Sequence, residues 1–295
     1  MTDPLGMIRP DTGRLLRDLD RAPPTELDEV WEAWLHNHLG VRSCVLLLAG
    51  YGETMLEAVT DGLEAVTDGS ARDGPGMGRH DITDSPAGLA YQQQRVVRRE
   101  QPDLVDIGTQ LVVYLPVTIR TERLGVLVVN LADQTMTNEV EEILDDVAQV
   151  IAYVLTGARR YTDKFEMLRR RRDLSLPAEI QWELLPNLAY ELPEFSIAGS
   201  LEPAYDIGGD TFDYAVNARK LTVSITDAVG HGLRAALLGS LAVTAMRNAR
   251  RSNAPLLAQA VAANQHLAEQ FPGASWVTGL DWHPGTPTRN TDALP

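Results

Sequence analysis

The sequence predicts an α+β protein with two domains joined by a helical connector. Three observations lead to this fold class. The chain has 295 residues, more than one typical domain requires. Both halves contain short β-branched or apolar runs, typical of strands, which alternate with longer segments of helical periodicity. Between the halves, residues 158–186 are strongly charged and carry apolar side chains at helical spacing.

Changes in composition set the predicted boundaries. Residues 1–24 mix charge with Gly and Pro and are interpreted as a flexible arm. A first domain is expected over residues 25–157, the connector over 158–186 and a second domain over 187–280. Residues 281–295 are predicted to form an irregular tail, because they are rich in Pro and Thr.

Composition disfavours several classes of function. The formal net charge of −15 argues against a nucleic-acid partner, because the phosphate backbone attracts a basic surface. The chain has no apolar run of about 18 residues, the length of a membrane span, and its start lacks the apolar region of a signal peptide. We therefore expect a cytoplasmic protein without a membrane partner. The single cysteine, Cys44, lies in an apolar run and is predicted to be buried.

In the first domain, a helix is expected between a Thr25 cap and Gly40, where glycine favours the end of a helix. Apolar runs predict strands at 41–49 and 54–60, and the Gly- and Asp-rich residues 69–86 predict a loop. The further elements are predicted as a helix, two strands of a hairpin and a helix capped by Thr137, at residues 87–97, 111–119, 124–131 and 137–155.

The order of these elements resembles a GAF domain over residues 25–157. Leu115-Pro116-Val117 followed by Leu124-Gly125-Val126-Leu127 is similar to the central hairpin of that family. The resemblance implies a domain that binds a small molecule, haem or bilin, or that dimerises. No Cys or His occupies a position that we can assign as a haem or bilin ligand.

In the connector, Tyr161, Phe165 and Leu168 are spaced as on one helix face, and Pro177 is suited to open a second helix. Paired connector helices between two domains favour a coiled-coil contact, so we expect a homodimer through the GAF and connector helices. Four arginines at 169–172 are interpreted as a solvated helix face in preference to a phosphate or membrane site.

Two acidic, glycine-rich turns organise the second domain. Residues 206–210 read Asp-Ile-Gly-Gly-Asp and residues 227–232 read Asp-Ala-Val-Gly-His-Gly. Strands predicted beside these turns bring Asp210 and Asp227 close together. Paired carboxylates on rigid strands suit Mg²⁺ or Mn²⁺, and the glycines allow tight turns. The surrounding strands and helices are expected at 196–200, 211–216, 221–226, 233–250 and 255–270.

These motifs resemble the PPM (PP2C-like) phosphatases of the SpoIIE/RsbU type. The matching segments are residues 181–186, 206–213, 227–237 and 276–280. The resemblance implies a GAF-like sheet with flanking helices, the helical connector and then a partial PP2C-like α-β-β-α sandwich. It also implies a metal-dependent protein serine/threonine phosphatase regulated by a GAF sensor. The implied partner is a phosphoserine or phosphothreonine protein, an anti-sigma-factor antagonist in bacterial partner switching.

The resemblance also implies roles for individual residues. Asp210 and Asp227 would bind a pair of Mn²⁺ or Mg²⁺ ions, together with the backbone carbonyl of Ala228. No side chain is assigned as catalytic, because a water held by the metal ions would attack phosphorus. The residues of the supporting turns are Gly208, Gly209, Gly230, His231 and Gly232.

The second half departs from the family pattern after Leu280. The further strands of that family and its later Asp-Gly metal ligands have no counterpart in residues 281–295, where neither Asp281 nor Asp292 stands in a matching motif. We therefore expect a site with too few carboxylates for both metal ions, and weak or no turnover. The alternatives are a non-catalytic, GAF-containing dimeric regulator and a small-molecule sensor with a vestigial output half.

Overall fold

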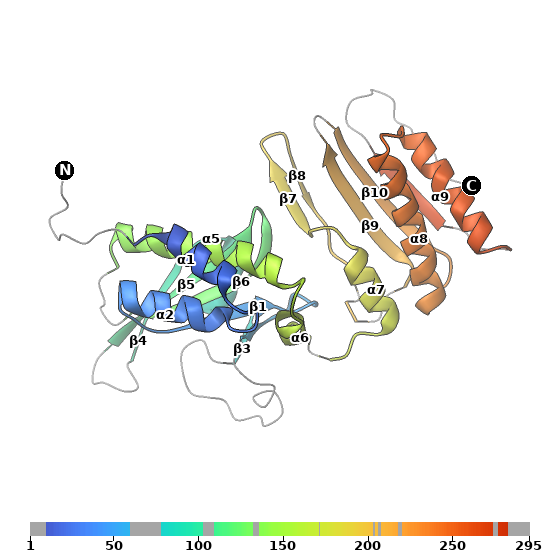
Figure 1. The fold of residues 1–295 in the computed structure, drawn as a ribbon. Helices are drawn as coiled ribbons and strands as arrows, with labels where there is room; N and C mark the ends of the chain where they lie inside the picture. The colour runs from blue at the N-terminus through green and yellow to red at the C-terminus, as the bar shows by residue number, and fades with distance from the viewer. Residues whose placement is uncertain are drawn as a thin grey trace. The chain divides into compact units, whose positions relative to one another are not determined.

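The computed structural model divides the chain into two compact units, Met1–Arg171 and Arg172–Pro295. The division falls inside the predicted connector, and each unit is described by itself. The predicted α+β class is confirmed, because both units combine antiparallel sheets with helices (Figure 1). The structure describes residues 10–59, 78–102, 109–131, 136–170, 172–202, 204–205, 208–217, 220–273 and 277–282.

A six-stranded antiparallel sheet in the order β3-β2-β1-β6-β5-β4 forms the centre of the first unit. Its middle strands are long and apolar, and the edge strands are short or polar, as expected where pairing occurs on one side alone. The strands are β1 (Val41–Ala49), β2 (Met55–Ala58), β3 (Arg79–Asp81), β4 (Val97–Pro102), β5 (Thr109–Ile119) and β6 (Glu122–Leu131).

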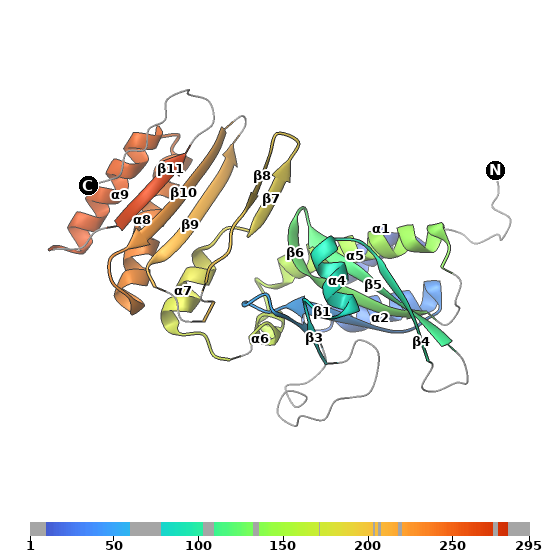
Figure 2. The same cartoon turned by 180° about the vertical axis from the view of Figure 1, so that it is seen from behind.

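Helices cover both faces of this sheet and enclose two apolar cores. One face packs against α1 (Thr12–Arg21), α2 (Leu27–Leu39), α5 (Asn138–Ala158) and α6 (Lys164–Leu168). The other face packs against α4 (Pro86–Gln93), which lies in front of the sheet in Figure 2. Alternation along β5 explains the two cores, because odd-numbered residues from Leu111 face one layer and even-numbered residues face the other.

The prediction of a flexible arm over residues 1–24 is wrong for residues 12–21. Residues 12–21 form α1, whose Leu15 and Leu19 are buried in the larger core and whose exposed residues are polar apart from Leu16. These two leucines are four residues apart and therefore lie on one helix face. Burial against α5 stabilises a helix that is too short to persist alone. Residues 1–9 lie outside the described residues.

Several elements of the first unit match their predictions closely. β1 spans the predicted residues, and α5 begins after Thr137, whose side chain accepts a hydrogen bond from the Val140 amide. Gly40 ends α2 in the left-handed conformation. The predicted Thr25 cap is wrong, because α2 has no side-chain cap and the Thr25 carbonyl accepts a hydrogen bond from Lys164. Cys44 is buried, as predicted.

The predicted helical face of the connector is also corrected. α5 ends at Ala158, so Tyr161 lies in a turn with 79% of its surface exposed, while Phe165 on α6 is fully buried in the first unit's core. Lys164 holds α6 to α2 through an ion pair with Asp28 at 2.8 Å. The start of the connector is therefore packed into the first unit instead of standing free.

Arg169 contradicts the interpretation of the arginine run as a solvated helix face. It lies after α6, and its guanidinium donates a hydrogen bond to the Ala49 carbonyl at 3.0 Å. It also pairs with Glu166, which accepts a hydrogen bond from the Tyr51 hydroxyl at 2.5 Å. Burial raises the pKa of Glu166, but Arg169, Arg159 and the Tyr51 hydroxyl outweigh it, so the net pKa is lowered.

The second unit contains a three-stranded antiparallel sheet in the order β11-β10-β9, with helices over one face (Figure 1). A separate hairpin of β7 and β8 precedes it. The strands are β7 (Ala189–Leu192), β8 (Phe195–Ala198), β9 (Asp210–Asn217), β10 (Lys220–Ala228) and β11 (Val277–Trp282). The helices are α7 (Leu176–Leu184), α8 (Gly232–Arg251) and α9 (Leu256–Gln270).

The two faces of this sheet differ in composition. Toward α8, β9 and β10 present small and polar side chains, among them Asp213, which pairs with Arg247 and Arg250 of α8. Its side chain is 3% exposed, so the two guanidiniums neutralise a buried charge. The opposite face carries Phe212, and Ile225 with 56% of its surface exposed. The apolar side chains of this sheet therefore lie largely on its open face.

Among the residues that the structure describes, every helix is too short or too polar to cross a bilayer.

Candidate metal centre and adjoining pocket

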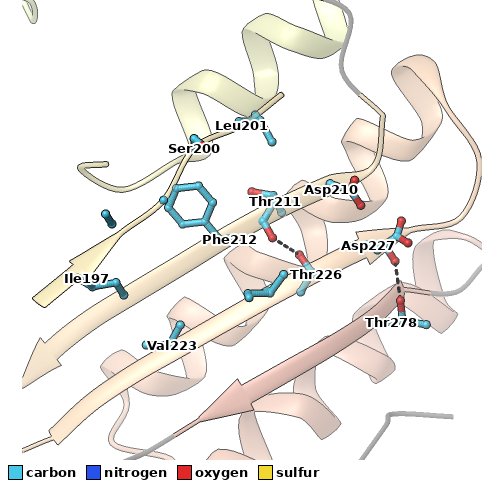
Figure 3. A pocket seen from close by; sticks show the side chains of 13 residues that line it. Ile197, Ser200, Leu201, Asp210, Thr211, Phe212, Val223, Thr226, Asp227 and Thr278 are labelled. Atoms are coloured by element: carbon cyan, nitrogen blue, oxygen red, sulfur yellow. Dashed lines mark hydrogen bonds between the residues drawn. The ribbon is translucent and has the colours of Figure 1, made fainter. Parts of the chain in front are cut away.

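Asp210 and Asp227 are brought together as the sequence predicts. Asp210 is the first residue of β9, Asp227 is next to last in β10, and the two are direct register partners. Residues paired across antiparallel strands point to the same face, so both carboxylates lie at one end of the open face (Figure 3). Both residues are exposed to solvent.

The electrostatics of this pair favour a bound cation. Partial burial raises the pKa of Asp210, and the charge of Asp227 and a hydrogen bond with its carboxyl group raise it further. Two carboxylates this close repel each other when both are ionised. A divalent cation between them would relieve that repulsion, because carboxylate oxygens are preferred ligands of Mg²⁺ and Mn²⁺.

Gly209 allows the two strands to approach closely beside the carboxylates. The amide of Ala228 donates a hydrogen bond to the Gly209 carbonyl at 3.2 Å. A Cβ atom on Gly209 would lie 2.2 Å from the Ala228 carbonyl oxygen, closer than any side chain permits. This places the Ala228 carbonyl beside the backbone that leads into Asp210. Gly208 has open space where its Cβ would be.

The second glycine turn joins β10 to α8. Gly230 and Gly232 have φ values of 91° and 72°, in the left-handed region that glycine adopts without strain. His231 between them is the N-cap residue of α8, is exposed, and forms no side-chain capping hydrogen bond. Its position is that of a turn residue, which leaves the carboxylate pair as the chemical centre of this region.

Gln181 on α7 is a positioning residue that the sequence analysis does not assign. Its side-chain amide donates a hydrogen bond to the Asp210 carbonyl at 3.0 Å, and the residue is 1% exposed. Its side-chain oxygen is also buried and has no hydrogen-bond partner in the described structure. A buried glutamine within an apolar helix face is the signal that could have indicated this role.

β11 adds a third strand beside the pair. Thr278 is the register partner of Asp227, and its hydroxyl donates a long hydrogen bond, 3.4 Å, to the Asp227 carbonyl (Figure 3). Asp206, Ile207 and Trp276, which belong to the predicted motifs, lie outside the described residues.

A pocket of about 740 Å³ opens beside the carboxylates. It lies on the open face of the sheet, and the segment that follows β8 lines one side of it (Figure 3). Its described lining is apolar apart from Ser200, three threonines and the Asp pair, and contains no lysine or arginine. The residues that supply apolar surface include Ile197, Leu201, Phe212, Val223 and Ile225.

The donor set fits one divalent cation better than two. Asp210 and Asp227 offer carboxylates and Ala228 offers a nearby carbonyl, and Mg²⁺ is commonly held by one or two carboxylates while it keeps several waters. Among the described residues, no three His, Cys, Asp or Glu side chains gather where they could hold a metal ion. A second ion would need further acidic ligands.

Comparison with protein families supports the predicted resemblance of the second unit to SpoIIE-type phosphatases. The family model of the stage II sporulation protein E (SpoIIE) matches residues 217–284. The match includes the turn from Asp227 to Gly232 and both helices that cover the sheet, whereas Asp210 precedes it. The predicted resemblance to SpoIIE-type phosphatases is confirmed over this segment. A search of curated proteins finds no match to the chain.

Solved GAF domains are similar to about half of the chain. The GAF domain of an Acinetobacter phosphoenolpyruvate-protein phosphotransferase has 15% identity and a TM-score of 0.39, with 51% of this chain and 93% of that chain covered. The corresponding domain from Coxiella burnetii has 17% identity and a TM-score of 0.40, with 50% and 92% covered. TM-scores of this size say nothing about function. The fold of the first unit is established by its own strand order and its two hydrophobic cores.

Proposed function

We propose that this chain is a GAF-regulated, metal-dependent phosphatase of phosphoserine or phosphothreonine proteins, acting on anti-sigma-factor antagonists in bacterial partner switching. The observation that carries the proposal is the register pairing of Asp210 with Asp227 beside the Gly209 contact. The SpoIIE family match to residues 217–284 supports the same reaction class. The GAF-like order of the first unit supports a sensory role for that half.

The residues of the second unit have distinct tasks in this proposal. Asp210 and Asp227 supply the anionic oxygens that hold Mn²⁺ or Mg²⁺, and Gln181 and Gly209 fix the backbone from which Asp210 projects. When bound, a divalent cation supplies Lewis-acid polarisation of the phosphoryl group and lowers the pKa of water. Since no described lining residue is basic, the substrate phosphate relies on the cation for its counter-charge.

Phosphate release from a phosphoserine protein and from p-nitrophenyl phosphate, with and without Mn²⁺, tests the proposal. We expect weak turnover that requires Mn²⁺ and falls to background in Asp210→Asn and Asp227→Asn. Glu269→Gln is a matched control, because it removes one exposed negative charge from α9. Turnover that survives both Asp substitutions would refute the assignment. Calorimetric titration should find one Mn²⁺ per chain, and two tight sites would contradict the incomplete ligand set.

A non-catalytic dimeric regulator is the second candidate. It is favoured by the lack of a three-residue metal cluster among the described residues. Because α6 is packed into the first unit, we propose that a homodimer would use the outer surfaces of α1 and α5, where Leu16 and Tyr153 are 43% and 51% exposed. Light scattering of the wild type and of Tyr153→Asp tests this contact. A dimer without Mn²⁺-dependent turnover would favour the regulator over the enzyme.

A further inference from the structure

Residues 159–169 lead from the end of α5 toward the boundary of the first unit, and charged side chains fix them at both ends of α6. At the start of α6, Lys164 pairs with Asp28 of α2 at 2.8 Å. After its end, Arg169 donates a hydrogen bond to the Ala49 carbonyl at 3.0 Å. We call residues 159–169 the strap. Its helical part, α6, lies beside the end of β1 (Figure 1).

Arg169 binds the turn between β1 and β2 through both its side chain and its backbone. The guanidinium lies 4.6 Å from the centre of the Tyr51 ring, and the Arg169 carbonyl accepts a hydrogen bond from the Tyr51 amide at 3.3 Å. Gly50 permits this approach, because a Cβ atom there would lie 3.2 Å from the same carbonyl. The Tyr51 hydroxyl donates in turn to Glu166 of α6. The strap and the turn therefore hold each other in place.

The strap has little stability of its own. α6 has five residues, fewer than an isolated helix needs to persist. Of the strap residues, all of which the structure describes, Phe165 alone is fully buried, and Met167 is 44% exposed. The side chains of Glu166 and Arg169 are 20% and 17% exposed, so water reaches their ion pair. A segment held mainly by polar contacts near the surface opens more easily than the packed core beneath it.

Arg169 also connects the strap to the layer on the other face of the sheet. Burial raises the pKa of Tyr91 on α4 and that of Glu122 at the start of β6, and Arg169 partly offsets the rise in both. The guanidinium of Arg123 lies 6.0 Å from the centre of the Tyr91 ring. A ligand that moves α4 or this end of the sheet would therefore change the surroundings of Arg169.

We propose that the strap is a switch that sets the length of the tether between the two units. The closed strap leaves residues 169–175 between α6 and α7, whereas the open strap frees residues 159–175. At about 3.3 Å per residue, the greatest reach of the tether grows from about 23 Å to about 56 Å. A longer tether lowers the effective concentration of one unit at the other, about fourfold for this change in length. The inference is independent of the proposed phosphatase function, because it concerns residues of the first unit.

Hydrogen exchange of the full chain tests whether the strap opens by itself. The Tyr51 amide is a direct reporter, because its acceptor is the Arg169 carbonyl. Arg169→Gln should speed exchange at Tyr51 and in α6 about tenfold, the usual effect of losing a hydrogen bond to a charged group, and leave exchange in β6 unchanged. Arg160→Gln, at an exposed arginine of the strap, is the matched control. Exchange that rises equally in β6, or that does not rise at Tyr51 and α6, would overturn the proposal.

Tyr51→Phe is a milder second variant. It removes the hydroxyl that donates to Glu166 and keeps the ring beneath the Arg169 guanidinium. Exchange in α6 should become about fivefold faster, as expected for one neutral hydrogen-bond donor. Tyr161→Phe removes a hydroxyl from a tyrosine of the strap that is 79% exposed and should change nothing. Equal effects of the two substitutions would contradict the role assigned to Tyr51.

Trypsin cleavage of the intact chain gives an independent measurement. The bond between Lys164 and Phe165 is closed to a protease while Phe165 is buried, so its cleavage rate follows the population of open strap. Arg169→Gln and Arg160→Gln each lack one arginine, and the first should release the fragment that ends at Lys164 about tenfold faster. Equal rates would overturn the switch. Neither measurement requires Mn²⁺ or phosphate release, so the result is separate from that of the phosphatase assay.

Discussion

The side-chain amide of Gln181 donates a hydrogen bond to the backbone carbonyl of Asp210, at 3.0 Å, and so joins α7 to the proposed metal ligand. α7 is the first helix of the second unit and begins at Leu176, shortly after the boundary between the units. A change in the position of α7 would therefore move the Asp210 backbone directly.

Gln181→Leu should weaken Mn²⁺ binding by about tenfold, because partners that orient a ligand affect metal affinity on that scale. Gln259→Leu is a matched control. Gln259 is also a buried glutamine, and it donates to the Ala254 carbonyl at 2.9 Å. Each substitution should cost about 1 kcal/mol of stability, the usual contribution of one such hydrogen bond. Equal Mn²⁺ affinities of the two variants in titration calorimetry would argue against a link between Gln181 and the metal site.

Gly209→Ala should separate β9 from β10 at the carboxylate pair. The new methyl group would lie 2.2 Å from the Ala228 carbonyl, and relief of such a contact costs about 1–3 kcal/mol. We expect Mn²⁺ binding to be lost together with that stability. Gly208→Ala places the same methyl group in open space and should change stability by less than about 0.5 kcal/mol. Urea unfolding and Mn²⁺ titration of both variants check the contrast.

Asp213→Asn should destabilise the second unit by about 3 kcal/mol, because it leaves two partly buried arginines without their carboxylate. Arg247 also donates to the Leu184 carbonyl, so this cluster ties α7 to α8. The exposed pair Arg14–Asp18 provides a comparison, and Asp18→Asn should cost less than about 1 kcal/mol. Equal effects in chemical denaturation would mean that the buried cluster contributes nothing beyond a surface ion pair.

Acid should destabilise the first unit through Glu166. Its pKa is lowered below the ordinary value of 4.5 in the folded state, so the folded form binds fewer protons there than the unfolded form does. The resulting stabilisation is present above pH 4.5 and is lost as the pH falls through the folded-state pKa. Glu166→Gln should lower stability at pH 7 and flatten this acid dependence. Urea unfolding midpoints of the first unit, measured between pH 7 and pH 3, test the sign of this pH dependence.

The elements that were predictable from sequence have one clear periodicity and a local boundary signal. β1 is a continuous apolar run from Cys44 to Ala49, and α5 has a Thr137 cap before its amphipathic repeat. The polar strand β4 was missed, because its six residues include three charged side chains and its pairing with β5 alone makes it a strand. Thr25 offered a plausible cap, but α2 begins at Leu27 with Glu26 as its N-cap residue, so Thr25 lies one residue too early.

The candidate site, too, was predictable from the sequence only in part. The proximity of Asp210 and Asp227 follows from two local motifs joined by a hairpin, so it could be predicted. The contact of Gln181 with Asp210 and the Gly199 contact with Phe212 depend on where α7 and the segment after β8 pack. Tertiary packing of this kind leaves no periodic signal in the chain.

Because the two units have separate hydrophobic cores, each unit can serve as a reference for the other in a calorimetric scan of the intact protein. The core of the first unit is rich in large aliphatic side chains, whereas the second unit has small clusters in which alanine is frequent. The second unit should therefore melt at the lower temperature. A ligand raises the melting temperature of the unit that binds it. One scan of the full chain can thus distinguish an effector of the GAF-like unit from Mn²⁺ or a phosphopeptide, because the other transition stays where it was.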